Sequence, residues 1–97
     1  MAKPVCVVVG VGEGNGAALA RAFAREGMAV ALLARGTDYT NSLADELEDA
    51  RAYACDAADP QSIASAFAAI RSDLGDPAVL VYNAGSGVRG DAESISL

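Results

Sequence analysis

The chain has 97 residues, of which 53% are hydrophobic and 5% aromatic, and its formal net charge is −6. This hydrophobic share excludes a disordered chain, and the negative charge with few aromatic side chains excludes a general nucleic-acid-binding protein. Because charged residues or glycines interrupt every apolar run, the sequence also excludes a membrane span of about 20 apolar residues.

Strand-like and helix-like segments alternate along the chain. Residues 5–9 are a continuous β-prone apolar run, which is typical of a strand buried on both faces. The strongest helix signal is Asp59 at an N-cap with Pro60 at the first helical position. The expected strands are 5–9, 28–34, 51–55 and 78–82, and the expected helices are 17–26, a helix that opens at 36–38, and 60–74.

Apolar residues three or four positions apart share one side of a helix and indicate which side faces the sheet. Gly27 and Gly75 are expected to end the first and third helices. The expected buried positions are Leu19, Phe23, Ala18 and Ala22 in the first helix, Leu43 and Leu47 in the second, and Ile63, Phe67, Ile70 and Leu74 in the third.

The order β-α-β-α-β-α-β predicts an α/β fold with a Rossmann-like, doubly wound parallel sheet in the strand order 3-2-1-4. The first and third strands then lie about 10 Å apart. A disulfide needs Cα atoms within about 7 Å, so Cys6 and Cys55 are expected to be reduced, buried thiols. Reduced cysteines, and the lack of a signal-peptide core after Met1, favour a soluble cytoplasmic protein.

A glycine-rich loop connects the first strand to the first helix. Its glycines allow positive φ angles and let phosphate oxygens approach the amides at a helix N-terminus. No Lys-Ser/Thr pair follows, which excludes a Walker A loop. The loop fits G-x-G-x-x-A from Gly12 and G-x-x-x-G-x-G from Gly10, and we favour the second because it starts where the strand ends. The residues expected to bind a dinucleotide pyrophosphate are Gly10, Gly12, Glu13, Gly14, Asn15 and Gly16.

In the frame that starts at Gly10, the sequence resembles the short-chain dehydrogenase/reductase family, whose loop motif is T-G-x-x-x-G-x-G. Asn83, Ala84 and Gly85 match the end of the family's N-N-A-G motif, and Asp56 matches the aspartate that contacts adenine. The resemblance covers residues 5 to about 90. It implies a fold that is incomplete relative to the family, with 1–90 as a partial dinucleotide-binding domain and 91–97 as a polar tail that starts a missing linker or helix.

Two positions depart from the family motifs. Val9 replaces the threonine, which removes a hydroxyl that helps to hold the loop, and Tyr82 replaces the first asparagine. The resemblance implies that Asn83 ties the fourth strand to its surroundings and that Gly85 leaves room for the nicotinamide ribose. Ala84 belongs to the same cofactor-binding turn.

The end of the second strand bears on the choice of cofactor. An acidic residue there would accept hydrogen bonds from a ribose 2′-OH, whereas Ala34 followed by Arg35 suits a 2′-phosphate. Glu13 would oppose a 2′-phosphate if its carboxylate pointed inwards. The sequence therefore favours NADP(H) over NAD(H).

The segment after the third strand holds two aspartates with different expected roles. Asp56 either accepts a hydrogen bond from the adenine amino group, as the family match implies, or forms an Asx-turn with its own backbone. Ala57 is assigned to the same part of the cofactor site. Asp59 is expected to be a helix cap only.

The resemblance implies hydride transfer between a nicotinamide and a carbonyl or alcohol carbon, catalysed by a serine, a tyrosine and a lysine four residues after the tyrosine. None of the three tyrosines has a lysine at that spacing, because the only lysine is Lys3, and the sequence has no histidine. No metal-ligand pattern is present either. We therefore expect a chain that binds the cofactor without catalysing the reaction by itself.

Two other functions stay open at the level of sequence. One is a non-catalytic module that binds a nucleotide or recruits a partner. The other is a different Rossmann-like segment, such as part of a methyltransferase, which Ala34 and Arg35 disfavour because no acidic residue ends the second strand. The fourth strand would form an unpaired sheet edge, so we expect a homo-oligomer or a partner that covers it.

Overall fold

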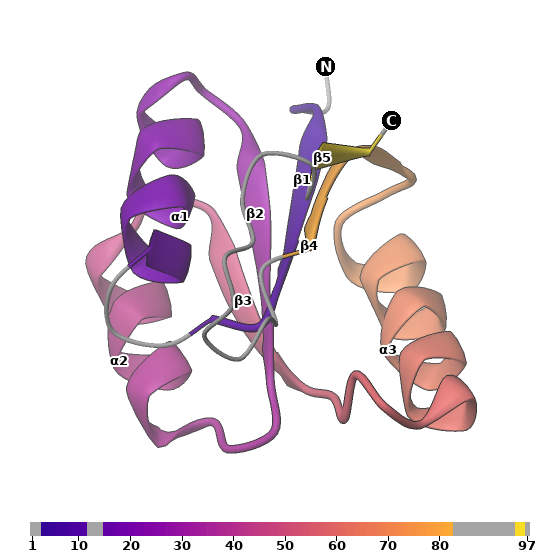
Figure 1. The fold of residues 1–97 in the computed structure, drawn as a ribbon. Helices are drawn as coiled ribbons and strands as arrows, with labels where there is room; N and C mark the ends of the chain where they lie inside the picture. Colours follow the sequence, from indigo (N-terminus) through magenta and orange to yellow (C-terminus); the bar gives the residue numbers. More distant parts are fainter. Residues whose placement is uncertain (1–2, 12–14, 83–94, 97) are drawn as a thin grey trace.

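The computed structural model describes residues 3–11, 15–82 and 95–96. The elements in chain order are β1 (Val5–Val9), α1 (Asn15–Arg25), β2 (Ala29–Ala34), α2 (Asp38–Glu46), β3 (Ala50–Ala54), α3 (Pro60–Asp73), β4 (Pro77–Tyr82) and β5 (Ile95–Ser96). The sheet has the order β3-β2-β1-β4-β5, and β1 to β4 run in parallel (Figure 1). The doubly wound order 3-2-1-4 predicted from the sequence is confirmed.

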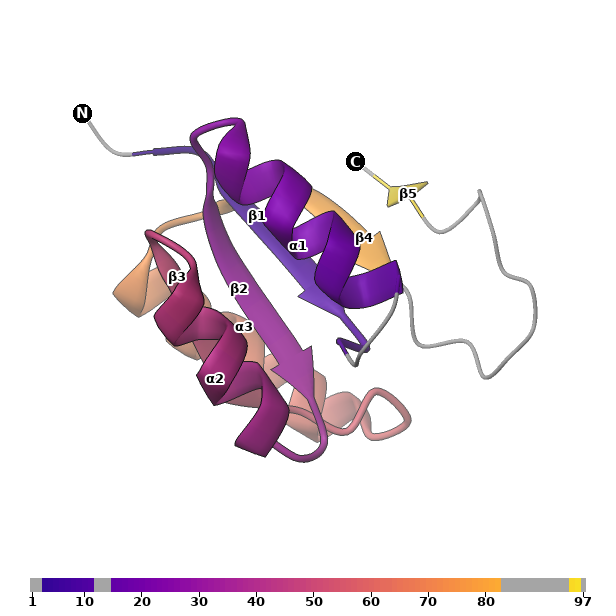
Figure 2. The ribbon, with the colours of Figure 1, turned by 90° about the vertical axis from the view of Figure 1, so that its left-hand side faces the viewer.

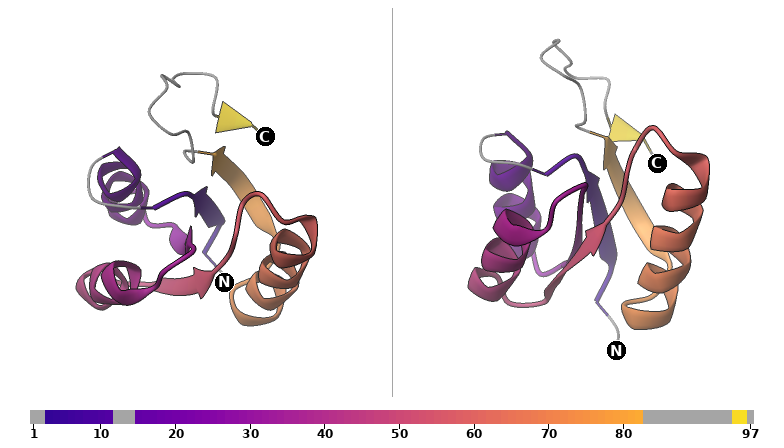
Figure 3. Two further views of the ribbon diagram at one scale, coloured as in Figure 1. Left: turned by 60° about the horizontal axis from the view of Figure 1, so that its bottom comes forward. Right: turned by 90° about the horizontal axis from the view of Figure 1, so that it is seen from below.

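The helices form layers on both faces of the sheet. α1 and α2 cover one face and α3 covers the other, which the views along the sheet in Figure 3 show from two sides. The layering follows from right-handed crossovers, because the first two crossovers lead away from β1 in one direction and the third leads in the other. Within the described ranges, no helix is long and apolar enough to cross a membrane.

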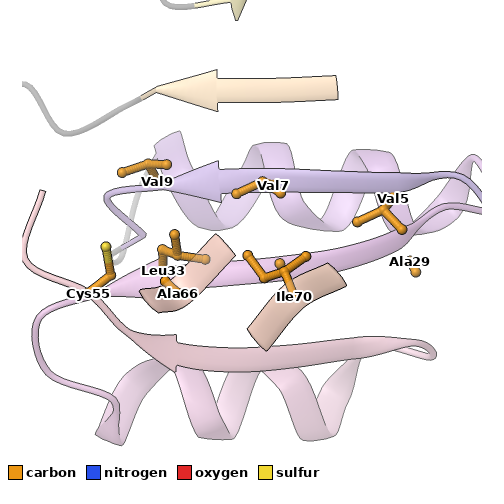
Figure 4. Packing of buried hydrophobic residues seen from close by; sticks show 9 residues of the cluster. Val5, Val7, Val9, Ala29, Leu33, Cys55, Ala66 and Ile70 are labelled. Atoms are coloured by element: carbon orange, nitrogen blue, oxygen red, sulfur yellow. The ribbon is translucent and has the colours of Figure 1, made fainter. Parts of the chain in front are cut away.

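β1 lies at the centre of the sheet and is buried along its whole length. Its side chains alternate between two hydrophobic clusters: Val5, Val7 and Val9 point to the α3 face (Figure 4), and Cys6 and Val8 point to the face under α1 and α2. Because both faces of this strand are covered, neither set of alternate positions tolerates a polar residue. This explains the unbroken apolar run from 5 to 9.

The predicted helix ends are confirmed by their hydrogen bonds. The side chain of Asp59 accepts a hydrogen bond from the Gln61 N–H at 3.0 Å, with Pro60 in the first turn of α3. Gly27 and Gly75 have φ angles of +90° and +124°, which only glycine adopts without strain. The Gly75 N–H then donates to the carbonyl of Ile70, which closes the last turn of α3.

The buried side of α1 differs from the one expected from the sequence. Ala17 and Ala20 are the fully buried residues of this helix, and Ala18 is exposed. Leu19 and Phe23 pack against the core only in part. The physical reason is that small alanines let the helix axis approach β1 closely, and the larger side chains then lie at the border of the contact.

The other two helices match their expected patterns more closely. Leu43 of α2 is buried, and Leu47 packs in part just beyond the end of the helix. In α3, Ile70 is fully buried, while Ile63 and Phe67, and Leu74 just beyond the end of the helix, pack against the core in part. The sequence analysis did not identify Thr40 of α2, which is also fully buried.

The edge of the sheet beyond β4 corrects one expectation. β5 pairs with β4 in antiparallel orientation, with Leu80 opposite Ser96 and Val81 opposite Ile95. The expected fully unpaired edge is therefore wrong for these two positions of β4. The two residues of β5 form backbone hydrogen bonds with β4 there. A strand of two residues is too short to be recognised from a sequence pattern.

Cys6 and Cys55 are both buried, free thiols, as predicted. The structure adds that they lie on opposite faces of the sheet, Cys6 under α1 and α2 and Cys55 under α3. Burial raises the pKa of the Cys6 thiol to about 11. Both cysteines therefore serve as small apolar core residues.

Candidate functional site

The carboxyl ends of three neighbouring strands are joined by backbone hydrogen bonds just beyond the sheet. The N–H groups of Gly10 and Val11 both donate to the carbonyl of Leu33, at 2.8 and 3.0 Å. The Cys55 N–H donates to the carbonyl of Ala34 at 2.9 Å. Figure 4 shows Val9, Leu33 and Cys55 at this same end of the strands. The loops that follow β1, β2 and β3 therefore start side by side at one edge.

The first of these loops begins at Gly10, which has a φ angle of +89°. A side chain here would be strained, so this position needs glycine for its backbone conformation. The next helix, α1, starts beside the carboxyl end of β1 (Figure 2). Gly16, in the first turn of α1, is buried. The first turn of a helix carries N–H groups without intrahelical partners, and these attract anions.

The second loop carries Arg35, one residue after the end of β2. Arg35 is exposed, as is Gly36, where an added Cβ would meet no atom within 4 Å. Among the ion pairs formed by residues 3–11 and 15–82, none uses the Arg35 guanidinium. The structure thus places an exposed arginine directly after the end of β2, and neither of the two residues there is acidic.

The third loop begins with Asp56, which is partly buried. Its Oδ1 accepts a hydrogen bond from the Ala58 N–H at 3.0 Å, which is the Asx-turn anticipated as one of its two roles. This turn does not exclude a ligand, because a carboxylate has further lone pairs on both oxygens. Ala57 packs against the core on the α3 face. Asp59 caps α3 and is not part of the site.

One residue of this loop was not singled out from the sequence. The Asp56 N–H donates to the Oγ of Ser62 at 2.8 Å, and Ser62 lies in the first turn of α3. A serine near a helix start commonly binds a backbone group, so its position after Asp59 and Pro60 was a usable signal.

Tyr82 ends β4 at the same edge as the three loops. Its side chain is 48% exposed, and among the described residues no other large hydrophobic side chain is exposed. Its β1 partner in the parallel ladder is Val9. Within the described part of the chain, no group of three or more His, Cys, Asp or Glu side chains could hold a metal ion. The predicted site residues Gly12, Glu13, Gly14, Asn83, Ala84 and Gly85 lie outside the described residues.

Known proteins are similar to this chain in sequence and in the arrangement of the strands and helices. The family model described as short chain dehydrogenase matches residues 4–97. A D-threitol dehydrogenase from Mycolicibacterium smegmatis is 34% identical over 97 residues, a match that covers 96% of this chain and 37% of that enzyme.

Two solved structures show the same fold with a dinucleotide named in their descriptions. An actinorhodin polyketide ketoreductase with NADPH has a TM-score of 0.83 and 30% identity, covering 99% of this chain and 40% of that chain. A metagenomic short-chain oxidoreductase in complex with NADP has a TM-score of 0.82 and 33% identity, covering 90% and 41%. The chain spans 28% to 41% of the first relatives and structures that it matches.

Proposed function

Because the chain belongs to the short-chain dehydrogenase/reductase family, we propose that it supplies the NAD(P)(H)-binding part of an oxidoreductase. Such an enzyme transfers hydride between a nicotinamide cofactor and a carbonyl or alcohol carbon, which is the chemistry that the bound cofactor supplies. The observation that carries this proposal is the meeting of three loops, with Gly10, Arg35 and Asp56, at the carboxyl edge of a doubly wound sheet. Ligands of open α/β sheets bind at this edge, where the strand order reverses.

The glycine loop would hold the pyrophosphate. Gly10 has the positive φ angle that starts the turn, and the two N–H groups of Gly10 and Val11 are fixed to Leu33 of β2. This anchoring leaves the first turn of α1 as the source of free amides for the phosphates. We include Gly12, Glu13, Gly14, Asn15 and Gly16 in the same pyrophosphate site, and Asn83, Ala84 and Gly85 at the nicotinamide ribose.

We further propose that the cofactor is NADP(H) rather than NAD(H). The support is the exposed Arg35 at the end of β2, together with the lack of a carboxylate at the position that would accept the ribose 2′-OH. A guanidinium binds a phosphate through a planar pair of donors, which suits a 2′-phosphate. Asp56 and Ala57 would contact the adenine.

In this proposal residues 1–90 are the cofactor-binding unit, and these 97 residues alone do not catalyse hydride transfer. The support is the inventory of the sequence, in which no tyrosine is followed four residues later by a lysine. A non-catalytic nucleotide-binding module is the second candidate, for the same reason. Turnover of a carbonyl substrate by the chain with NADPH would contradict both.

We also propose that a second copy or a partner covers the edge of the sheet beyond β4, since among the described residues β5 pairs with Leu80 and Val81 and with no other residue of β4. Light scattering over a range of protein concentrations tests this. A monodisperse monomer at the highest concentration would contradict the second copy and leave a different partner as the covering chain.

The cofactor proposal is tested by titrating the chain with NADPH and with NADH while following cofactor fluorescence. We expect NADPH to bind more tightly, and Arg35→Asp to weaken NADPH by about tenfold or more while changing NADH much less. Arg25→Asp is the matched control, because Arg25 is also exposed but ends α1 at the opposite edge of the sheet. Arg25→Asp changes the net charge of the protein by the same amount, so any general repulsion of the anionic cofactor is equal in the two variants.

The outcome separates the parts of the proposal. If neither dinucleotide binds below millimolar concentration, the cofactor-binding function is wrong. If both bind and Arg35→Asp weakens them equally, the function stands and the NADP(H) preference is wrong.

A further inference from the structure

The backbone and side chain of Asp56 are held by three separate hydrogen bonds. Its N–H donates to Ser62 Oγ at 2.8 Å, its carbonyl accepts from the Asp59 N–H at 2.9 Å, and its Oδ1 accepts from the Ala58 N–H at 3.0 Å. The hydrogen bonds among the described residues leave Oδ2 without a donor. One carboxylate oxygen at the carboxyl edge of the sheet is therefore oriented and still able to accept.

The three hydrogen bonds do not have equal consequences. The bond from Ala58 stays within the loop, and the bond from Asp59 joins the Asp56 carbonyl to the N-cap residue of α3. The bond to Ser62 joins it to α3, which is fixed to the sheet by the buried residues Ala66 and Ile70. The Cys55 N–H bond to Ala34 holds the preceding residue to β2, and the Ser62 bond is the side-chain contact that helps to set where Asp56 lies relative to the sheet.

We propose that Ser62 is a positioning residue for adenine recognition, which rests on the function proposed above. Its hydroxyl holds the Asp56 N–H, so that the carboxylate meets the exocyclic amino group of the adenine at hydrogen-bond distance. A bond of this kind weakens steeply when distance or angle departs from its optimum. Ser62 thereby sets the preference for adenine over a base that lacks the amino group, such as hypoxanthine.

The test compares NADPH with its deamino analogue, in which hypoxanthine replaces adenine, for binding to the full chain. We expect Ser62→Ala to weaken NADPH about fivefold and to change binding of the analogue by less than about twofold, because the analogue has no amino group for Asp56. Ser62→Thr keeps the hydroxyl and is expected to restore the preference for NADPH. Ser65→Ala is the matched control, since Ser65 is exposed on the same helix.

A merely structural role of Ser62 predicts that Ser62→Ala weakens both ligands equally and leaves the ratio of their affinities unchanged. That result would overturn the proposal. If the unaltered chain binds neither ligand, the proposed function fails first and the inference with it. Asp56→Asn provides a second route: it should lower the ratio by itself, and Ser62→Ala should then lower it no further.

Discussion

The two faces of the sheet are covered differently. The face with Cys6, Val8 and Leu32 lies under two helices, α1 and α2, which are tied together by the Arg21 Nε and Glu46 Oε2 at 2.9 Å. Among the described elements, α3 is the helix that covers the other face, and both cores are bordered by side chains that pack in part. The same central strands thus contribute to two cores, one covered by two helices and the other covered by one helix.

This difference has a consequence for how each face responds to change. A core enclosed by two helices has little freedom to collapse around a missing side chain, whereas a single helix can shift against the sheet. The site loops start from strands shared by both faces, and Asp56 depends on α3 through Ser62. The adenine end of the proposed cofactor site is therefore held through the face that α3 covers.

The largest expected effect comes from removing a buried leucine on each face. Leu32 and Leu33 are neighbours on β2, both 0% exposed, and they point to opposite faces. We expect Leu32→Ala to lower the free energy of unfolding by about 4 kcal/mol and Leu33→Ala by about 3 kcal/mol, because the α3 face can relax. Urea unfolding at one pH measures both. A greater loss for Leu33→Ala would reverse the comparison.

The next effect concerns alkaline pH and the face under α1 and α2. The pKa of Cys6 is raised by burial from 9.0 to about 11, so the folded state holds its proton where the unfolded state has lost it. Stability from this group is complete below pH 9 and is lost as the pH rises through about 11, by about 3 kcal/mol. Urea unfolding at successive pH values measures the loss.

The matched variant for this prediction is Cys6→Ala, which removes the titrating thiol. We expect it to be less stable than the unaltered chain at neutral pH and to lose less stability between pH 9 and 11. An identical slope in both proteins would show that burial of Cys6 does not govern the alkaline response.

A smaller effect is expected on the α3 face. The Tyr53 hydroxyl donates to Asp73 Oδ2 at 2.9 Å, which ties β3 to α3. Burial, and then this hydrogen bond, raise the pKa of Tyr53 to about 12. Tyr53→Phe should lower the free energy of unfolding by about 1 kcal/mol at neutral pH.

The ionisation of Tyr53 gives an independent check on the same contact. The difference in phenolate absorbance between the unaltered chain and Tyr53→Phe, followed against pH, should have its midpoint near pH 12. Asp73→Asn should move that midpoint to lower pH. An unmoved midpoint would mean that burial alone raises this pKa.

The smallest expected effect is a difference in access to the two thiols. Cys6 is 0% exposed under two helices, and Cys55 is 4% exposed under one helix at the edge of the site. In the native protein we expect a thiol reagent to modify Cys55 before Cys6. Mass spectrometry of the partly modified chain identifies the first site, and modification of Cys6 first would contradict the view that the α3 face opens more readily.

Most of the fold could be predicted from local sequence signals. The apolar runs, the cap at Asp59 and the glycines at 27 and 75 predicted the number and order of the elements between residues 5 and 82. Two features could not be predicted this way. Which side of α1 is exposed, as at Ala18, depends on how closely the helix approaches β1. The pairing of β5 with β4 depends on contacts between residues that are distant in the sequence.

For the site, the sequence identified Gly10, Arg35 and Asp56 as residues that follow strand ends, because glycine, arginine and aspartate at those points have specific chemical uses. The position of Ser62 after Asp59 and Pro60 signalled a bond to a backbone group, but not which one, since a serine in the first turn of a helix has several possible partners. Only the folded chain brings its hydroxyl to the Asp56 N–H.

The sequence by itself determined the doubly wound topology, because alternating helices and apolar strands have few ways to pack with right-handed crossovers. It also determined that Cys6 and Cys55 stay apart. Only the tertiary structure decided that these thiols lie on opposite faces, that α3 packs on the face opposite α1 and α2, and that Asp56 is bonded to α3. These outcomes depend on strand register and helix distance, which are set by side chains far apart in the chain.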